Sequence, residues 1–335
     1  MSGKKTVIRI FIAAAILSAG YFLGPKPNDP ELDNQLQKLN LEPRMVEQNI
    51  IAREALTKNI KADNASRIIW NDSIKKDKTP YCIVYLHGFS ASPEEGHPVH
   101  RDIARKFGCN LYLPRLYAHG LKEQEPLLEL DEKKYLASAK EAVAEAKCLG
   151  EKVIIMGTST GCTFALYIAS GNPDIAGLIL YSPNIDLRDT RSFLLTRPWG
   201  LQIARMIVGG NYYTFPGPAS AEKYWNMKYR IEAIVCLKNI LEHTMTKDVF
   251  NKIKQPVLMC YYYKNEKEQD NVVSVPAMLD MFDQLGTLNT MKRKIALPDA
   301  RAHALASGLW SNSIADVERE TTDFLEETLK MKIWK

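Results

Sequence analysis

The stretch Gly157-Thr158-Ser159-Thr160-Gly161 lies between an apolar run, Val153–Met156, and a segment with helical character, Cys162–Ala169. The order of strand, G-x-S-x-G and helix predicts a sharp turn, because glycine at both ends lets the chain reverse within a few residues. The turn would present Ser159 at a helix N-terminus, where backbone N–H groups and the helix dipole favour a developing negative charge. We interpret Ser159 as a nucleophile; the plainer interpretation is a glycine-rich turn with a solvated serine.

A second apolar run, Tyr81–Leu86, leads into His87-Gly88-Phe89. With these two stretches the chain resembles the α/β-hydrolase superfamily, and within it the serine carboxylesterases and monoacylglycerol-lipase-like enzymes. The resemblance implies an oxyanion hole made by the backbone N–H groups of Phe89 and Thr160. It also implies that Gly88 lets the backbone approach the substrate, and that His87 is structural.

A serine nucleophile needs a base, and the base needs an acid to orient it; in this superfamily the chain order is serine, acid, histidine. The histidines that follow Ser159 are His243 and His303. The resemblance makes His303 the base, since it lies between the last expected strand and a closing helix expected over residues 313–330. His243 falls in a helical part of an insertion, and we expect it to take no part in catalysis.

The best candidate for the acid is Asp270, which follows an expected strand, Val257–Tyr263, and a charged loop. Val272 and Val273 come directly after it, as the superfamily pattern requires. The resemblance therefore implies that Asp270 fixes the tautomer and orientation of His303. Three other carboxylates compete, but they lack either the valine pair or the reach to His303: Glu266, Glu268 and Asp299.

Short apolar runs alternate with helix-like segments along the 335 residues, of which 46% are hydrophobic. Such runs are typical of parallel strands that are buried on both faces. One helix is expected over residues 132–148, with small apolar residues on one face. The alternation predicts an α/β fold with a doubly wound, mostly parallel sheet. Its expected strands are Tyr81–Leu86, Asn110–Leu113, Val153–Met156, Ile175–Tyr181, Val257–Tyr263 and Lys294–Leu297.

The alternation breaks from about residue 183 to 250, where we expect a helical cap inserted into a hydrolase domain of residues 63–335. Residues 25–62 should form a proline-rich linker followed by one or two polar helices. Aromatic side chains over a serine site suit an apolar acyl or aryl substrate, although each could equally pack the cap onto the core. The aromatic residues of the cap are Phe193, Trp199, Tyr212, Tyr213, Phe215, Tyr224, Trp225 and Tyr229.

The first 24 residues have a different character. Lys4 and Lys5 precede an apolar run from Thr6 to Leu23 whose one charged residue is Arg9. A spanning helix needs about 20 residues and the apolar part of a signal peptide is shorter, so both interpretations stay open. We favour a single-pass transmembrane anchor, with its basic flank in the cytosol and the catalytic domain outside. The alternative is export after cleavage of a signal peptide.

Several classes of function lack support in the sequence. The net charge of +5 includes Lys4, Lys5 and Arg9, and no basic stripe interleaved with aromatics indicates nucleic-acid binding. We expect no cofactor, since no G-x-G-x-x-G or P-loop motif occurs, and no metal site at the nearby pair His97 and His100. Most of the six cysteines read as buried thiols, although export would permit disulfides. The sequence does not indicate the oligomeric state.

The sequence thus predicts a membrane-anchored or exported serine hydrolase. Ser159, His303 and Asp270 would cleave a carboxylic ester through an acyl-enzyme, with the Phe89 and Thr160 N–H groups as the oxyanion hole. Its partners would be a small-molecule ester and a membrane, with no nucleic acid. The alternatives are a thioesterase, a lipase or a serine peptidase of the same fold, a catalytically silent hydrolase fold that binds a partner, or an anchored interaction protein whose function lies in residues 25–62.

Overall fold

A seven-stranded sheet forms the centre of the computed structural model, which describes residues 4, 6–7, 11 and 18–334. The strand order is β1-β3-β2-β4-β5-β8-β9. β1 is antiparallel to β3, and the other pairs are parallel. The bounds are β1 (Arg67–Ile69), β2 (Thr79–Leu86), β3 (Asn110–Leu113), β4 (Gly150–Thr158), β5 (Gly177–Tyr181), β8 (Val257–Tyr261) and β9 (Lys292–Ala296).

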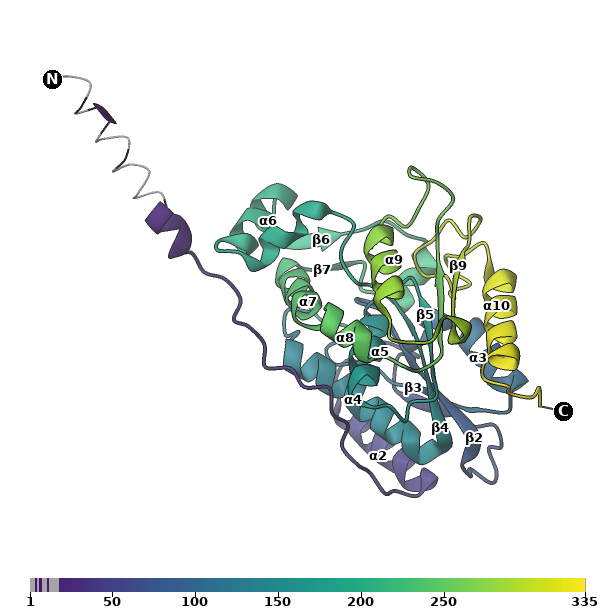
Figure 1. Cartoon of the computed structure of the whole chain (residues 1–335). Coiled ribbons are helices and arrows are strands. Elements are labelled where there is room, and N and C mark those ends of the chain that lie inside the picture. Colours follow the sequence, from purple (N-terminus) through teal and green to yellow (C-terminus); the bar gives the residue numbers. More distant parts are fainter. Residues whose placement is uncertain (1–3, 5, 8–10, 12–17, 335) are drawn as a thin grey trace.

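Helices cover both faces of the sheet (Figure 1). Alternate residues of β2 enter different cores: Val84 packs on one face and Ile83 and Tyr85 on the other. Burial on both faces explains why the strands read as continuous apolar runs. One face carries α2 (Pro43–Leu56), α4 (Glu132–Leu149), α5 (Thr160–Gly171), α8 (Lys247–Lys252) and α9 (Val275–Gln284), and the other carries α3 (Val99–Lys106) and α10 (Ile314–Glu327).

The doubly wound, mostly parallel sheet predicted from the sequence is confirmed. Each of the six expected strands is present, with ends that differ by a few residues. The sequence did not reveal β1, because three residues are too few to show a period. α4 begins where predicted, and the side chain of its N-cap Asp131 accepts a hydrogen bond from the Lys134 N–H at 2.9 Å.

The chain between β5 and β8 forms the cap segment. It begins after Tyr181 and contains a short antiparallel hairpin, β6 with β7. Figure 1 shows α6 and this hairpin beyond the carboxyl ends of the strands. Its elements are η2 (Thr190–Thr196), α6 (Gly200–Val208), β6 (Tyr212–Thr214), η3 (Ala219–Lys223), β7 (Lys228–Arg230) and α7 (Ile231–Thr244).

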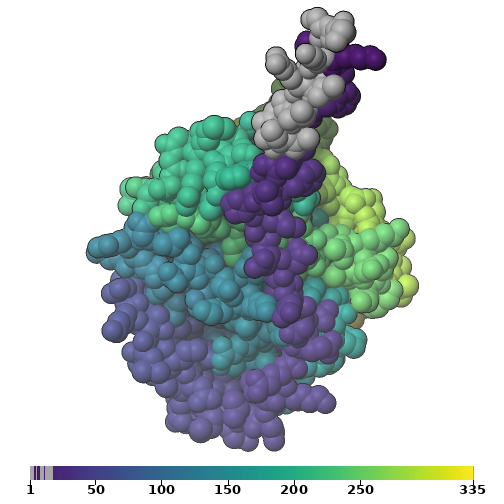
Figure 2. All heavy atoms as spheres, turned by 90° about the vertical axis from the view of Figure 1, so that its left-hand side faces the viewer, coloured from purple at the N-terminus to yellow at the C-terminus, as the bar shows by residue number. Residues whose placement is uncertain are grey.

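Residues 25–42 run in an extended conformation across the surface of the domain (Figure 2). The first helix after this extended segment is α2, which starts at Pro43. Of the one or two polar helices expected within residues 25–62, the structure therefore has one. Side chains of the domain hold the extended segment: Asn239 donates to the Asn28 carbonyl at 2.9 Å, and Tyr167 donates to the Leu32 carbonyl at 3.1 Å.

No helix within the described residues is long and apolar enough to cross a membrane. The anchor predicted at residues 1–24 lies largely outside the described residues, and it remains a prediction. All six cysteines are buried and carry free thiols.

Candidate active site

Ser159 stands at the turn between β4 and α5, in the middle of the sheet. Its backbone has φ 54° and ψ −118°, a conformation that non-glycine residues rarely adopt. Neighbouring contacts hold it there: the Ser159 N–H donates to the Tyr181 carbonyl at 2.9 Å, and the Asn184 N–H donates to the Ser159 carbonyl at 3.1 Å. The turn therefore has the strained geometry of a nucleophile elbow.

The flanking glycines are required by crowding. A Cβ atom on Gly161 would lie 1.8 Å from the Leu86 carbonyl oxygen, and one on Gly157 would lie 3.0 Å from that same oxygen. β2 and the start of α5 thus pack backbone to backbone. The G-x-S-x-G spacing follows from this close approach.

His303 and Asp270 meet beyond the carboxyl ends of the strands, where Ser159 also lies. His303 is in the loop after β9, and Asp270 is in the loop after β8. His303 Nδ1 lies 2.7 Å from Asp270 Oδ2. The other carboxylate oxygen, Oδ1, accepts the N–H groups of Val272 at 2.9 Å and Val273 at 3.1 Å. The valine pair therefore supplies the two backbone donors that fix the carboxylate. With a proton on Nδ1, the imidazole has a lone pair on Nε2 to accept a proton.

Electrostatics match these positions. Burial alone would raise the pKa of Asp270, but His303 and the two backbone N–H groups hold that pKa below its usual range. Burial alone would lower the pKa of His303, but Asp270, and then Glu95, raise it above its usual value. The pair can therefore carry an imidazolium next to a carboxylate.

The candidate oxyanion donors lie on two neighbouring elements. Thr160 is the first residue of α5, and Phe89 follows the end of β2. Among the hydrogen bonds of the described residues, none uses the N–H of Phe89 or of Thr160. A Cβ atom on Gly88 would lie 3.2 Å from the Ser159 Cβ, so the two turns are in contact. Both N–H groups are thus available beside Ser159.

The other histidines have roles in packing. His87 is fully buried; its Nε2 accepts the Leu116 N–H at 3.1 Å, and its Nδ1 lies 2.9 Å from the Gly88 carbonyl. Burial, and then His119, lower the pKa of His87, which keeps it neutral. The Nδ1 of His243 lies 2.8 Å from the Asn239 carbonyl within α7.

Of the carboxylates that compete with Asp270, Glu266 and Glu268 form hydrogen bonds within their own exposed loop.

Two residues of the site carried no signal in the sequence. Arg188, at the start of the cap segment, donates from Nη1 to the Asp270 carbonyl at 2.7 Å and from its backbone N–H to the Val272 carbonyl at 3.1 Å. Glu95 is 3% exposed and accepts the Gly88 N–H at 2.7 Å. Both depend on contacts between segments that are distant in sequence or separated by a turn.

An apolar cluster joins the cap to both catalytic loops. Ala91 follows the turn that ends β2, Ala304 follows His303, and both belong to one buried cluster with Trp225 of the cap segment. The rings of Trp225 and Trp310 meet edge to face at 5.8 Å between centroids. A separate hollow of about 1050 Å³ lies elsewhere, between the N-terminal segment, Arg115 and α4, and it contains no triad residue.

No family model matches the chain. A stretch of 108 residues is 30% identical to the thermostable monoacylglycerol lipase of a Bacillus species. The match covers 32% of this chain and 42% of that enzyme, so it spans less than half the length of the relative.

Solved structures resemble the chain over most of its length. A metagenome-derived lipolytic enzyme superposes with a TM-score of 0.64 and 16% identity, covering 80% of this chain and 100% of its own. A soluble variant of the monoglyceride lipase of Saccharomyces cerevisiae superposes with a TM-score of 0.57 and 14% identity, covering 91% and 99%. Est1E of Butyrivibrio proteoclasticus, bound to ferulic acid, superposes with a TM-score of 0.52 and 18% identity, covering 82% of this chain and 100% of its own.

Proposed function

We propose that this chain, which has the α/β-hydrolase fold, is a serine hydrolase that cleaves carboxylic esters of apolar acyl groups. The observation that carries the proposal is the 2.7 Å contact of His303 with Asp270 at the sheet edge that bears the strained Ser159 turn. The similarity to a monoacylglycerol lipase supports an ester as the substrate.

The proposed reaction has two halves, and in each of them His303 transfers protons. His303 accepts the proton of Ser159 as the hydroxyl attacks the ester carbonyl, and the N–H groups of Phe89 and Thr160 bind the oxyanion. His303 then protonates the leaving alcohol. In the second half it activates water, which releases the acid from Ser159. Asp270 holds the imidazole and stabilises its charged form.

An apolar acyl group is supported by the cluster around Trp225, since it contacts the loops on both sides of Ser159. The same machinery could act on a thioester or a peptide bond, and the cap rather than the triad would decide between these bonds. A catalytically silent binding protein remains the alternative from a different class.

The test is fluorophosphonate labelling and turnover of p-nitrophenyl esters from acetate to palmitate, with Ser159→Ala as the control. Labelling and turnover should both be lost in the variant. The dependence on chain length then separates an esterase from a lipase. A folded wild-type protein that neither labels nor turns over any ester would contradict the proposal and favour a binding protein.

We further propose that the N-terminal segment places the domain on a membrane, with residues 1–24 as an anchor and the catalytic domain outside the cytosol. Support comes from exposed apolar side chains of α6, namely Met206, Ile207 and Val208. Trp199 of the cap segment donates from Nε1 to the Gly20 carbonyl at 3.0 Å, which sets the end of that segment beside the cap.

Flotation with liposomes tests the membrane proposal. The full chain should float and a protein of residues 25–335 should not, because the three exposed apolar side chains of α6 are too few to hold the domain on a membrane alone. Equal behaviour of the two proteins would contradict the anchor. A mature N-terminus near residue 20 in a secreted product would favour export by a cleaved signal peptide.

A further inference from the structure

Glu95 is a buried carboxyl that the proposed mechanism does not use. It lies on η1 (Pro93–Gly96), directly after the oxyanion turn. Its Oε2 accepts the Gly88 N–H at 2.7 Å and the Tyr85 hydroxyl at 3.1 Å. Tyr85 in turn lies 2.8 Å from Oγ1 of Thr158, the residue before the nucleophile. One carboxyl group therefore connects the oxyanion turn to the strand end that carries Ser159.

Gly88 is packed closely between Glu95 and Ser159. A Cβ atom on Gly88 would lie 2.9 Å from Glu95 Oε1 and 3.2 Å from the Ser159 Cβ. The Gly88 backbone is thus held between the carboxyl and the nucleophile. The Gly88 N–H belongs to the peptide unit before the one that carries the Phe89 N–H, and the two units meet at the Gly88 Cα. A shift of the unit held by Glu95 would therefore also change the direction of the Phe89 N–H, an oxyanion donor.

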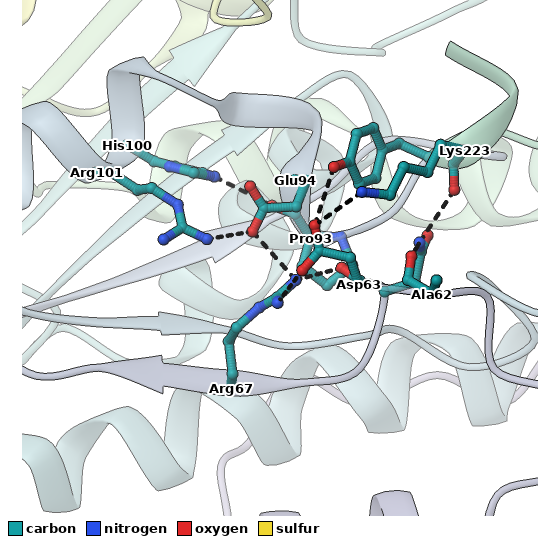
Figure 3. Close-up of polar contacts among 10 residues, drawn as sticks. Ala62, Asp63, Arg67, Pro93, Glu94, His100, Arg101 and Lys223 are labelled. Carbon is teal, nitrogen blue, oxygen red and sulfur yellow. Dashed lines mark hydrogen bonds and ion pairs between the residues drawn. The ribbon is translucent and has the colours of Figure 1, made fainter. Parts of the chain in front are cut away.

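A polar network fixes the η1 turn from the outside (Figure 3). The carboxylate of Glu94 pairs with Arg67 at 3.1 Å and with Arg101 of α3. The Pro93 carbonyl lies 3.2 Å from Nε2 of His100. The two residues before Glu95 are therefore anchored to β1 and α3, and the Glu95 side chain is directed inward.

The same network continues into the cap segment. Asp63 pairs with Arg67 at 2.6 Å and with Lys223 of η3 at 3.3 Å. It also accepts the Tyr224 hydroxyl at 3.0 Å. Figure 3 shows these groups converging on Asp63 beside the η1 turn. The cap, β1 and the turn that bears Glu95 thus form one connected support.

Glu95 interacts electrostatically with His303, the proposed base. The titratable groups that interact with it are Tyr85 on β2, Tyr135 on α4, Cys162 on α5 and His303. Burial keeps the first three neutral by raising the pKa of each. Burial also raises the pKa of Glu95 itself to about 7. His303 is therefore the group among them whose protonation changes with that of Glu95.

The histidines around the turn add no charge of their own. Burial lowers the pKa of His87 and of His100, so both are neutral near pH 7. Glu94 is adjacent in sequence, but its charge is matched by Arg67 and Arg101. The electrostatic link from Glu95 to the triad thus runs to His303.

We propose that Glu95 is a positioning residue: its carboxyl oxygen fixes the backbone at Gly88 so that the N–H of the next residue, Phe89, faces the oxyanion, and its charge stabilises the protonated form of His303. The inference rests on the proposed ester hydrolysis. Two variants separate its two parts. Glu95→Gln keeps an acceptor for the Gly88 N–H but has no charge, and Glu95→Ala removes both.

The experiment measures kcat, KM and the pH dependence of kcat/KM for both variants. Glu95→Ala should lower kcat by about 10- to 100-fold with KM within about twofold, as expected for a weakened oxyanion donor. Glu95→Gln should keep kcat within about threefold. Its acidic limb of kcat/KM should move to lower pH by about half a unit, because His303 loses a nearby negative charge.

Glu145→Gln is the matched control. Glu145 is also a buried carboxylate that accepts a tyrosine hydroxyl, that of Tyr112 at 2.6 Å, but it pairs with Arg53 and belongs to another part of the fold. This control should leave the acidic limb unchanged. An equal shift in Glu145→Gln, an unshifted limb in Glu95→Gln, or wild-type kcat in Glu95→Ala would overturn the proposal.

A readout that needs no turnover separates this proposal from the proposed function. The imidazole of His303 can be titrated by NMR in the wild type and in Glu95→Gln. A lower His303 pKa in the variant supports the link, and an unchanged one overturns it, even if Glu95→Ala fails to fold. A shifted His303 titration in a protein without esterase activity would contradict the proposed function alone.

Discussion

Two buried carboxyl groups interact with His303, and their pKa values shift in opposite directions. Asp270, in the loop after β8, has a lowered pKa, whereas burial raises that of Glu95, in the loop after β2, to about 7. Asp270 accepts two backbone N–H groups and touches His303. Glu95 accepts one backbone N–H and one hydroxyl. The number of donors, and contact with a cation, therefore decide in which direction the pKa of a buried carboxyl shifts.

The largest effect should come from removing the charge of Asp270. Asp270→Asn keeps an oxygen for the Val272 and Val273 N–H groups but presents a neutral side chain to His303. We expect kcat to fall by roughly 10⁴-fold, because the imidazole loses its orientation and the stabilisation of its charged form. Steady-state kinetics with an activated ester measure this fall in kcat. A loss no larger than that of Glu95→Gln would contradict the asymmetry between the two carboxyls.

The second prediction concerns stability as a function of pH. The pKa of Glu95 is about 7 in the fold against 4.5 for the free group, so its contribution to the free energy of unfolding is present below about pH 4.5 and is lost as the pH rises through 7. From pH 5 to pH 9 the wild type should lose on the order of 3 kcal/mol relative to Glu95→Gln. Urea unfolding at the two pH values measures the difference, and parallel pH profiles would contradict it.

The lowered pKa of Asp270 has the opposite sign. Its contribution to stability is present above its ordinary value of 3.8 and is lost as the pH falls through its lower value in the fold. The two carboxyls thus affect stability in separate pH ranges, and the comparison of Glu95→Gln with the wild type between pH 5 and pH 9 isolates Glu95.

The third prediction places a methyl group between the two turns. In Gly88→Ala the new Cβ would meet Glu95 Oε1 at 2.9 Å and the Ser159 Cβ at 3.2 Å. Either the Glu95 carboxyl group or the backbone must shift, and both movements disturb the oxyanion turn, so kcat should fall by about 10- to 100-fold with a smaller change in KM. If the double variant with Glu95→Ala is as active as Glu95→Ala alone, the carboxyl contact, rather than the contact with Ser159, causes the loss.

The smallest expected effect concerns the support of Asp270. Arg188→Met removes the donor at 2.7 Å from the Asp270 carbonyl but keeps much of the apolar stem. We expect kcat to fall about two- to fivefold and stability to fall by about 1 kcal/mol. Arg191→Met is the control, since Arg191 pairs with Asp189 at the exposed surface. Equal effects of the two substitutions would show that Arg188 has no special part in the loop.

Residues next to a regular element could be assigned from the sequence. Ser159 follows β4 and precedes α5, and the crowding at Gly157 and Gly161 requires glycine at both positions. Asp270 and His303 follow β8 and β9, and the structure brings them together. Their catalytic roles remain predictions, as do the roles of the Phe89 and Thr160 N–H groups. The sequence did not indicate the roles of Arg188 and Glu95, because packing between separate segments determines their hydrogen-bond partners.

The N-terminal part shows the same limit. A helix could be expected after Pro43, since proline favours the first turn, but the extended course of residues 25–42 depends on partners such as Asn239 and Tyr167. Local composition indicated polarity and could not indicate these partners. For the same reason the sequence did not reveal the antiparallel strand β1.

The sequence by itself determined the parallel sheet, the positions of the candidate catalytic groups along the chain and the sharp turn at Ser159, because these follow from local periodicity and from steric limits near glycine. The tertiary structure alone decided which buried carboxyl has a lowered pKa and which polar groups support each candidate catalytic loop. Burial and hydrogen-bond donors from distant segments set a side chain's pKa, and neither can be read from neighbours along the chain.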